Sequence, residues 1–338
     1  MRNTNFKTWS NNRKRTRFSK FHSWSTRPLG AFTRALEILS LGAPLQQIVR
    51  LNNDIDEIKH LIPNSWVNGA AFDLCTRKAR VSMKNGLVLL ESGHIIARHL
   101  NSHSYLSGNM TDEIRSLIRK KPAMFAGEII VVLPKQDYFY HFLIDFLPHI
   151  IRLCEENPNL IVLINQKEEK YVKEYLKLHD VRFEETNAKN ISVKQLIVPN
   201  FACLELKSIR SILCKSINAT KLLHVTPKKI AMLRFRGSRH DWEFESKLKD
   251  CLEMNGYIIF DPEYLHISEQ IKLFAGATNV VAIHGGVMAN LIYCKEGTYV
   301  QEIFTHAYRT LFFMAICKEI GLNYTSCDSA DFDFSRKI

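Results

Sequence analysis

Residues 279–290 read Asn-Val-Val-Ala-Ile-His-Gly-Gly-Val-Met-Ala-Asn, an apolar strand that runs into two glycines and then a short helix. Glycine lets the backbone approach a ligand, and the N–H groups at the start of a helix favour an anion. His284 ends the strand, and Gly285 and Gly286 follow it. This order of strand, turn and helix predicts an α/β fold with a ligand at the carboxyl end of the strand.

The alternation of strand and helix extends in both directions from this segment. In the second half we expect strands at 229–234, 257–260, 279–283 and 299–304, and helices after Asp241, at 267–275, at 287–293 and at 308–320, the last closed by Gly321. In the first half we expect strands at 128–133, 159–164, 181–184 and 195–198, and helices at 138–155, with a kink at Pro148, at 168–178 and at 206–219. Two such series predict two doubly wound α/β domains, at 37–215 and 216–338, which can face each other across a cleft.

The stretch 37–120 is less regular than the rest of the chain. Within it, residues 80–89 alternate around Asn85-Gly86, a dipeptide typical of the tight turn of a β-hairpin. A hairpin is therefore the one element that we predict there.

The positive charge is concentrated at the N-terminus. The chain carries a formal net charge of +12, from 46 Lys and Arg against 34 Asp and Glu. Nine of the bases and none of the acids lie in residues 1–36, so the remainder is nearly neutral. Aromatic residues alternate with these bases, a pattern that suits an anionic membrane surface. A flexible tail or a misassigned start codon are the alternatives, and we expect no nucleic-acid partner because no recognition module follows.

The cysteines and the hydropathy pattern bear on the compartment. None of the eight cysteines forms a Cys-x-x-Cys pair, so neither a zinc site nor a disulfide framework is expected. No apolar run approaches the ~18–20 residues of a membrane span, and the N-terminus lacks an apolar signal core. We therefore expect a cytoplasmic protein, peripheral at the inner face of the plasma membrane.

A histidine and an aspartate share one face of the predicted helix 138–155. His141 and Asp145 stand four residues apart in an apolar sequence. Because burying a carboxylate without a partner is costly, the two side chains should interact. Such a pair can act as a general base, although a purely structural hydrogen bond would give the same spacing.

A second group of polar residues follows the strands of the second domain. Arg234 and Arg239 lie in the loop after its first strand, and arginine forks suit diphosphate oxygens. His284 can reach a phosphate or a sugar, Asn290 is four residues beyond Gly286 on the same helical face, and Glu302 could bind ribose hydroxyls. Basic loops, packed turns and surface acids produce the same patterns without a ligand.

Taken in order, these segments resemble glycosyltransferase family 61. The resemblance covers about 127–325 and depends on Tyr140-His141, Asp145, Leu147-Pro148, Arg234, Arg239, Glu243, Phe260-Asp261-Pro262-Glu263, Ser268-Glu269-Gln270, Leu273-Phe274, Ala277, His284-Gly285-Gly286, Asn290, Gly297-Thr298 and Glu302-Ile303-Phe304. The family usually has His-Gly-Ala-Gly where this chain has His284-Gly285-Gly286-Val287, and an Asn where this chain has Trp242.

The resemblance implies a GT-B architecture of two Rossmann-like domains and an inverting, metal-independent glycosyltransferase. The donor would be a nucleotide sugar, usually UDP-linked, and the acceptor a surface-polysaccharide or lipid-linked glycan, as in bacterial capsule and lipopolysaccharide assembly. Asp145 and His141 would be catalytic; Arg234, Arg239, His284, Gly285, Gly286, Asn290 and Glu302 would bind the donor. A sugar-nucleotide epimerase, a pyruvyl transferase and a membrane-docked scaffold without catalysis remain alternatives.

Overall fold

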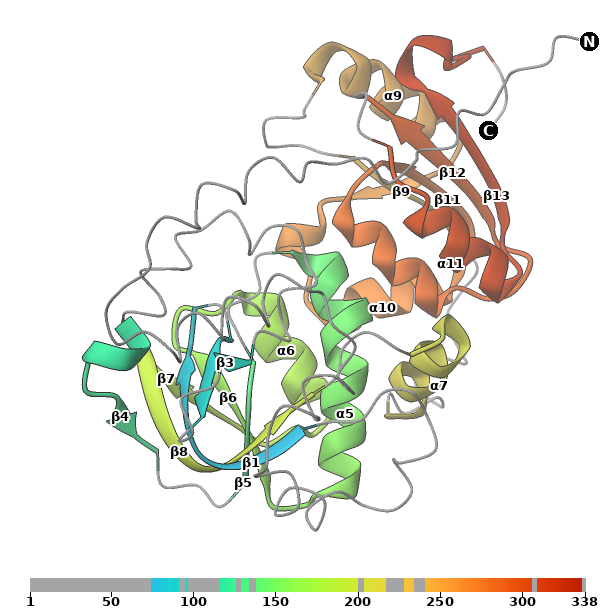
Figure 1. Ribbon diagram of the computed structural model, residues 1–338. Coiled ribbons are helices and arrows are strands. Elements are labelled where there is room, and N and C mark those ends of the chain that lie inside the picture. Colours follow the sequence, from blue (N-terminus) through green and yellow to red (C-terminus); the bar gives the residue numbers. More distant parts are fainter. Residues whose placement is uncertain are drawn as a thin grey trace, which may run out of the picture. The chain divides into compact units, whose positions relative to one another are not determined.

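The computed structural model describes residues 74–84, 86–90, 95–96, 116–125, 129–133, 138–199, 204–216, 228–233, 241–305 and 309–335. Within them the chain forms two β-sheets with helices packed against both (Figure 1). The basic arm predicted at 1–36 lies outside the described residues. Among those that are described, no helix is long and apolar enough to cross a membrane.

The first sheet is mixed. Its strands are β1 (Leu74–Ser82), β2 (Val88–Leu90), β3 (Ile95–Ile96), β4 (Ala123–Met124), β5 (Ile129–Val132), β6 (Leu160–Asn165), β7 (Phe183–Thr186) and β8 (Asn190–Val198). They run in the order β3-β2-β1-β8-β5-β6-β7, with β4 also paired to β8. The part from β8 to β7 is parallel, whereas β1, β2 and β3 are antiparallel. The predicted hairpin is confirmed: β1 and β2 pair on either side of Gly86, whose φ is +72°.

Helices of the first half cover one face of this sheet. They are η6 (His141–Phe146), α5 (Leu147–Glu156), α6 (Lys170–Leu178) and α7 (Leu206–Ser216). Alternate residues of β5 and β6 take part in two different cores. Val131 and Val162 pack with these helices, whereas Ile130 and Leu163 pack with β1, β2 and β8. The period of two in a strand explains this division.

The second sheet is parallel. Its strands are β9 (Lys228–Met232), β10 (Ile258–Phe260), β11 (Ala277–Ile283), β12 (Tyr299–Phe304) and β13 (Asn323–Asp328), in the order β10-β9-β11-β12-β13. Its helices are α9 (Trp242–Met254), η7 (Pro262–Tyr264), α10 (Ile267–Ala275), η8 (Gly286–Tyr293), α11 (Phe312–Ile320) and η9 (Ser329–Asp331). The mixed α/β class with parallel strands is confirmed. A cleft between two Rossmann-like domains, and the boundary between 215 and 216, stay predictions.

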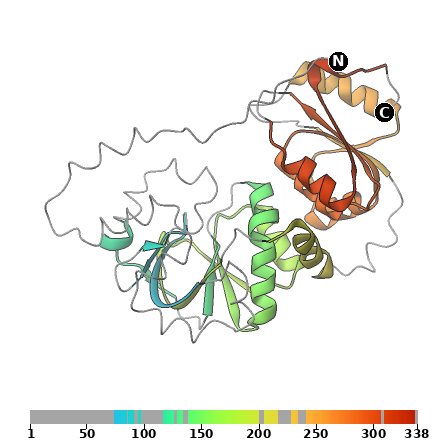
Figure 2. The same ribbon diagram turned by 45° about the vertical axis from the view of Figure 1, so that its right-hand side comes forward.

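Helices lie on both faces of the second sheet. Figure 2 shows α9 and α11 on opposite sides of it. Ala231 and Leu233 pack with α9, whereas Ile230 and Met232 pack with α10, α11 and η8. Asp241 accepts a hydrogen bond from the backbone N–H of Phe244 at 3.1 Å, which confirms the predicted N-cap of α9.

One apolar core extends through both halves of the chain. It contains residues of β5, β6, α5 and α6 from the first half and of β9, β11, α10, η8 and α11 from the second. Helices α6 and α10 pack together, as do α7 and α11. Because buried apolar surface is the main stabilising term in folding, this continuity holds the two halves together more strongly than any polar contact does.

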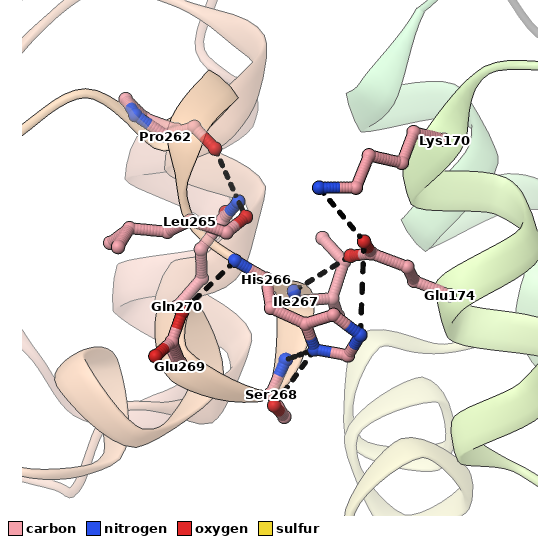
Figure 3. Close-up of polar contacts among 9 residues, drawn as sticks. All are labelled: Lys170, Glu174, Pro262, Leu265, His266, Ile267, Ser268, Glu269 and Gln270. Carbon is pink, nitrogen blue, oxygen red and sulfur yellow. Dashed lines mark hydrogen bonds and ion pairs between the residues drawn. The ribbon is translucent and has the colours of Figure 1, made fainter.

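Polar groups cross the same contact. The Glu174 carboxylate of α6 accepts a hydrogen bond from the backbone N–H of Ile267, the first residue of α10, at 2.9 Å (Figure 3). The same carboxylate lies 3.7 Å from the His266 ring and 3.3 Å from Lys170. A negative charge at the start of a helix satisfies unpaired N–H groups and favours the helix dipole. On α7, Arg210 donates to the Cys294 carbonyl at 2.8 Å.

Gly321 ends α11 in the left-handed conformation, with φ +80°, as the sequence predicts. A Cβ added there would lie 2.9 Å from Cγ of Glu296. We expect Gly321→Ala to lower the free energy of unfolding by about 1–2 kcal/mol, because an L-residue is strained at positive φ. Gly321→Asn is the matched control: it brings the same Cβ but tolerates this conformation better, so it should lose less. Urea unfolding measures both, and equal stability of Gly321→Ala and the wild type would contradict the expectation.

Candidate active site

A histidine–aspartate pair lies on the helix that follows β5. His141 Nδ1 and Asp145 Oδ2 are 2.6 Å apart, and the side chains are 34% and 39% exposed. Both lie on η6, a π-helical turn in which the N–H of Leu147 bonds to the carbonyl of Phe142. Pro148 follows directly, and in a regular α-helix its ring would clash with the carbonyl four residues earlier. A widened π turn relieves that clash, so the distortion expected at the proline takes this form.

A histidine–glutamate pair lies where β11 and β12 end. His284 Nδ1 is 2.5 Å from Glu302 Oε1, and the Tyr324 hydroxyl of β13 donates to Glu302 Oε2 at 2.6 Å. The Glu302 side chain is fully buried, and that of His284 is 11% exposed. Burial raises the pKa of Tyr324, and its hydrogen bond to Glu302 and the charge of that carboxylate raise it further. Tyr324 is therefore a protonated donor at neutral pH.

Aromatic rings connect the two pairs. The ring of Tyr140 meets the His141 ring edge-on, with centroids 5.4 Å apart, and packs edge-on against Phe313 at 5.7 Å. Phe313 in turn packs edge-on against His284 at 5.4 Å. Both histidine–carboxylate pairs thus border one aromatic cluster, although their residues are more than a hundred positions apart in the sequence.

Gly286 brings the backbones of η6 and η8 together. A Cβ added to Gly286 would lie 3.6 Å from the backbone nitrogen of Tyr140 and 3.8 Å from Cβ of Phe139. Tyr140 is partly buried. This burial raises the pKa of its hydroxyl, and the charge of Asp145 raises that pKa further. A protonated phenol therefore lies beside the Asp145 carboxylate.

A pocket of about 150 Å³ lies at the carboxyl ends of the second sheet's strands. It is lined by residues that end β9, β10 and β11 or begin η8: Met232, Leu233, Asp261, Pro262, Glu263, Ile283, Gly285, Gly286, Val287 and Met288. The chain passes from β9 to β10 on one side and then crosses to β11 on the other, so the pocket occupies the topological switch point of the sheet. Ligands of open α/β sheets bind at such points.

The structure brings together six of the predicted site residues, among them Glu302, which is hydrogen-bonded to His284. His141 and Asp145 border the aromatic cluster, Gly285 and Gly286 line the pocket, and His284 contacts Phe313. Arg234 and Arg239, predicted to bind diphosphate, lie outside the described residues. Glu302, predicted to bind ribose, lies beneath His284 with both oxygens hydrogen-bonded within the protein, and the ribose contact stays a prediction.

Asn290 lies differently from the sequence expectation. It is fully buried; its Oδ1 accepts from the Tyr175 hydroxyl, and its Nδ2 donates to Gln270 Oε1, both at 3.0 Å. The expectation assumed an α-helix, where Asn290 would share a face with Gly286. Segment η8 is a 3₁₀-helix, in which three residues make a turn, so a residue four positions on is rotated by about a third of a turn. In this structure Asn290 bridges α6 and α10 within the core.

Sequence reasoning missed Tyr324 and Phe313. Tyr324 lies in a strand whose sequence, Asn-Tyr-Thr-Ser-Cys-Asp, carries no apolar run, so the strand itself was not expected. Phe313 is an apolar residue of an expected helix, and nothing in its local sequence distinguishes it from other core residues. Its part in the site depends on the packing of α11 against η6.

Comparison with known proteins gives a match to a family model. Residues 139–301 match the model described as Glycosyltransferase 61, and no curated protein matches. Among solved structures, E. coli heptosyltransferase WaaC with ADP-2-deoxy-2-fluoro heptose is 11% identical at a TM-score of 0.34, covering 59% of this chain and 92% of WaaC. The iron-containing dodecameric glycosyltransferase TibC from enterotoxigenic E. coli is 10% identical at 0.30, covering 68% and 74%. At these TM-scores neither structure bears on function.

The matched segment begins two residues before η6 and ends within β12, so it contains His141, Asp145 and His284 but not Glu302. The protein is a glycosyltransferase. Within that class, the matched model supports family 61, the family that the ordered motifs resemble.

The buried amide offers a test of its role. We expect Asn290→Ala to lower the free energy of unfolding by roughly 1–3 kcal/mol, because it leaves the Tyr175 hydroxyl and the Gln270 amide oxygen without their partner. Nucleotide binding by the folded protein should stay within twofold. Tyr175→Phe, which removes only one hydroxyl, should cost less, and the two changes should not be additive because the groups are in contact. Normal stability together with lost nucleotide binding would instead assign Asn290 to the donor.

Proposed function

We propose that the protein is an inverting, metal-independent glycosyltransferase. It transfers a sugar from a UDP-linked donor to a surface-polysaccharide or lipid-linked glycan of a bacterial cell. The observation that carries the proposal is the close approach of η8 to the start of η6: a Cβ added to Gly286, which lines the pocket at the ends of β9, β10 and β11, would lie 3.6 Å from the backbone nitrogen of Tyr140, the neighbour of His141. The match to the family model supports the same chemistry.

The His141–Asp145 pair activates the acceptor. A hydroxyl of the acceptor attacks the anomeric carbon of the donor sugar while the bond from that carbon to the diphosphate oxygen breaks. The hydroxyl proton passes to Asp145, or to His141 supported by Asp145, and the diphosphate leaves with the bonding electrons. A single displacement inverts the anomeric centre. Partial exposure of both side chains, 34% and 39%, leaves them accessible to an acceptor.

The charge that develops on the diphosphate needs a positive partner. We assign this role to Arg234 and Arg239, which the sequence places after β9, and to the backbone N–H groups at the start of η8. His284, at the end of β11, contacts a phosphate or the donor sugar. These groups replace a metal ion in the proposal.

The proposal also covers the location of the enzyme. A lipid-linked acceptor would lie at an anionic membrane, and residues 1–36, with nine bases and no acid, suit the inner face of the plasma membrane. Co-sedimentation with anionic vesicles, comparing the full chain with a chain that lacks residues 1–36, tests this part. Loss of vesicle binding with retained transfer in solution supports it.

The catalytic base is tested by Asp145→Asn. We expect turnover, measured as nucleotide release in the presence of acceptor, to fall by ~10²-fold or more, because the amide cannot accept the proton or support His141. Glu155→Gln is the matched control: this exposed carboxylate lies one helix further along and pairs with Lys215, so turnover should be unchanged. Near-normal turnover of Asp145→Asn would remove Asp145 from the mechanism.

The donor is tested by thermal unfolding against a panel of nucleotide sugars. A ligand at a hundred times its Kd stabilises the folded state by about 2.7 kcal/mol, so the preferred base and sugar should appear as the largest shift in Tm. We expect UDP-sugars to rank first. Product formation from a UDP-sugar alone, with no acceptor, would indicate an epimerase, and no shift with any nucleotide sugar would contradict the proposal.

A further inference from the structure

We infer that Glu302 is a positioning residue that, together with Tyr324, holds the imidazole of His284 with its Nδ1–H directed into the protein. The contact that we propose between His284 and the donor is then made through Nε2. The inference rests on the proposed function, because it takes His284 as a donor contact. It differs from the ribose contact that the sequence suggests for Glu302.

The position of Glu302 follows from the strand register. Glu302 lies opposite Ala282, two residues before His284, and Tyr324 lies opposite Val300, two residues before Glu302. Side chains two positions apart share a face of the sheet, so His284, Glu302 and Tyr324 face the same helices. Cys317 of α11 lies against them: burial raises its pKa to about 12, and the charge of Glu302 contributes.

The hydrogen bonds account for both carboxylate oxygens. Oε1 is 2.5 Å from His284 Nδ1, and Oε2 accepts from the Tyr324 hydroxyl at 2.6 Å. The carboxylate is fully buried, and a buried carboxylate needs such partners because leaving one unpaired costs several kcal/mol. Because the Glu302 side chain has no exposed surface, it cannot contact a ribose directly.

These contacts fix the chemistry of the ring. A carboxylate oxygen accepts hydrogen bonds, so we infer that Nδ1 of His284 is the donor to Oε1 of Glu302. The partner of one imidazole nitrogen sets the protonation of the other, so the bond from Nδ1 to Glu302 also determines the tautomer at Nε2. Phe304 stacks on the ring at 5.1 Å, with 29° between the planes, and Phe313 meets its edge, which leaves the ring little freedom to turn.

The protonation of His284 is read by NMR of the full chain labelled with ¹⁵N-histidine. The His284 signals are identified by their loss in His284→Gln. We expect a proton on Nδ1 in the wild type, and changed Nδ1 resonances in folded Glu302→Gln. A wild-type ring that carries its proton on Nε2 and none on Nδ1 would overturn the inference. This measurement needs no substrate, so it stands whether or not the proposed function holds.

The kinetic test is a double-mutant cycle with the preferred donor and acceptor. We expect Glu302→Gln to lower kcat by about 10-fold or more and Tyr324→Phe by a smaller factor. In the His284→Gln background, Glu302→Gln should change kcat by less than twofold, because its effect passes through the ring. An equal loss in both backgrounds would overturn the inference. Gln301→Ala, on the other face of β12, is the matched control and should leave kcat unchanged.

Binding of the nucleoside monophosphate separates positioning from ribose contact. This ligand keeps the ribose but lacks the second phosphate and the donor sugar. If Glu302 only positions His284, Glu302→Gln should leave the Kd of the monophosphate within twofold, whereas a ribose contact predicts a tenfold or greater loss of affinity. Thermal unfolding first checks that Glu302→Gln folds. If Glu302→Gln does not fold, the kinetics of Tyr324→Phe and the wild-type NMR spectrum test the inference instead. If no nucleotide sugar shifts the Tm while Nδ1 of His284 is protonated, the proposed function fails and the hydrogen-bonded orientation of the His284 ring stands.

Discussion

The continuity of one apolar core through both sheets is the constraint on which the site depends. Helices η6 and α5 belong to the first sheet, and η8 and α11 to the second, yet all four contribute to the same core. This packing brings Gly286 close to the backbone of Tyr140 and places Phe313 against both Tyr140 and His284. Hydrogen bonds of Asn290, Glu174 and Arg210 also join the two halves. Because hydrophobic attraction is not directional, these bonds help to specify how the helices are oriented.

The two histidine–carboxylate pairs differ mainly in how far they are buried, and this difference suits them to different chemical roles. The His141–Asp145 pair is about a third exposed on both sides, so a hydroxyl from outside can reach it. Glu302 is fully buried, so it can act on a substrate only through His284. One pair is therefore suited to moving a proton, and the other to holding a ring in place. The first pair lies on η6 and the second at the ends of β11 and β12.

Much of the framework follows from local sequence. Apolar runs separated by turns predict most strands of both sheets, and Asp241 and Gly321 mark helix ends where the structure has them. The 3₁₀ form of η8 could not be predicted, because it depends on tertiary packing. The π turn of η6 could not be predicted either, because the surroundings determine how the helix adapts to Pro148. Strand β13 is polar along its length and forms because β12 offers a parallel edge. The position of Asn290 and the contact of Tyr324 were missed for these reasons.

The site also shows why a motif and its geometry can assign different roles to one residue. The sequence places Glu302 at the end of an apolar strand, where an acid in a nucleotide-binding fold often meets a ribose. Whether it reaches a ligand depends on which face of β12 it occupies and on what covers that face. Helix α11 and Tyr324 cover it here, while Asp261 and Glu263, after β10, line the pocket itself. An acid at the end of a strand is exposed to a ligand only if no helix covers it, and the covered Glu302 reaches a ligand only through its hydrogen-bonded neighbour His284.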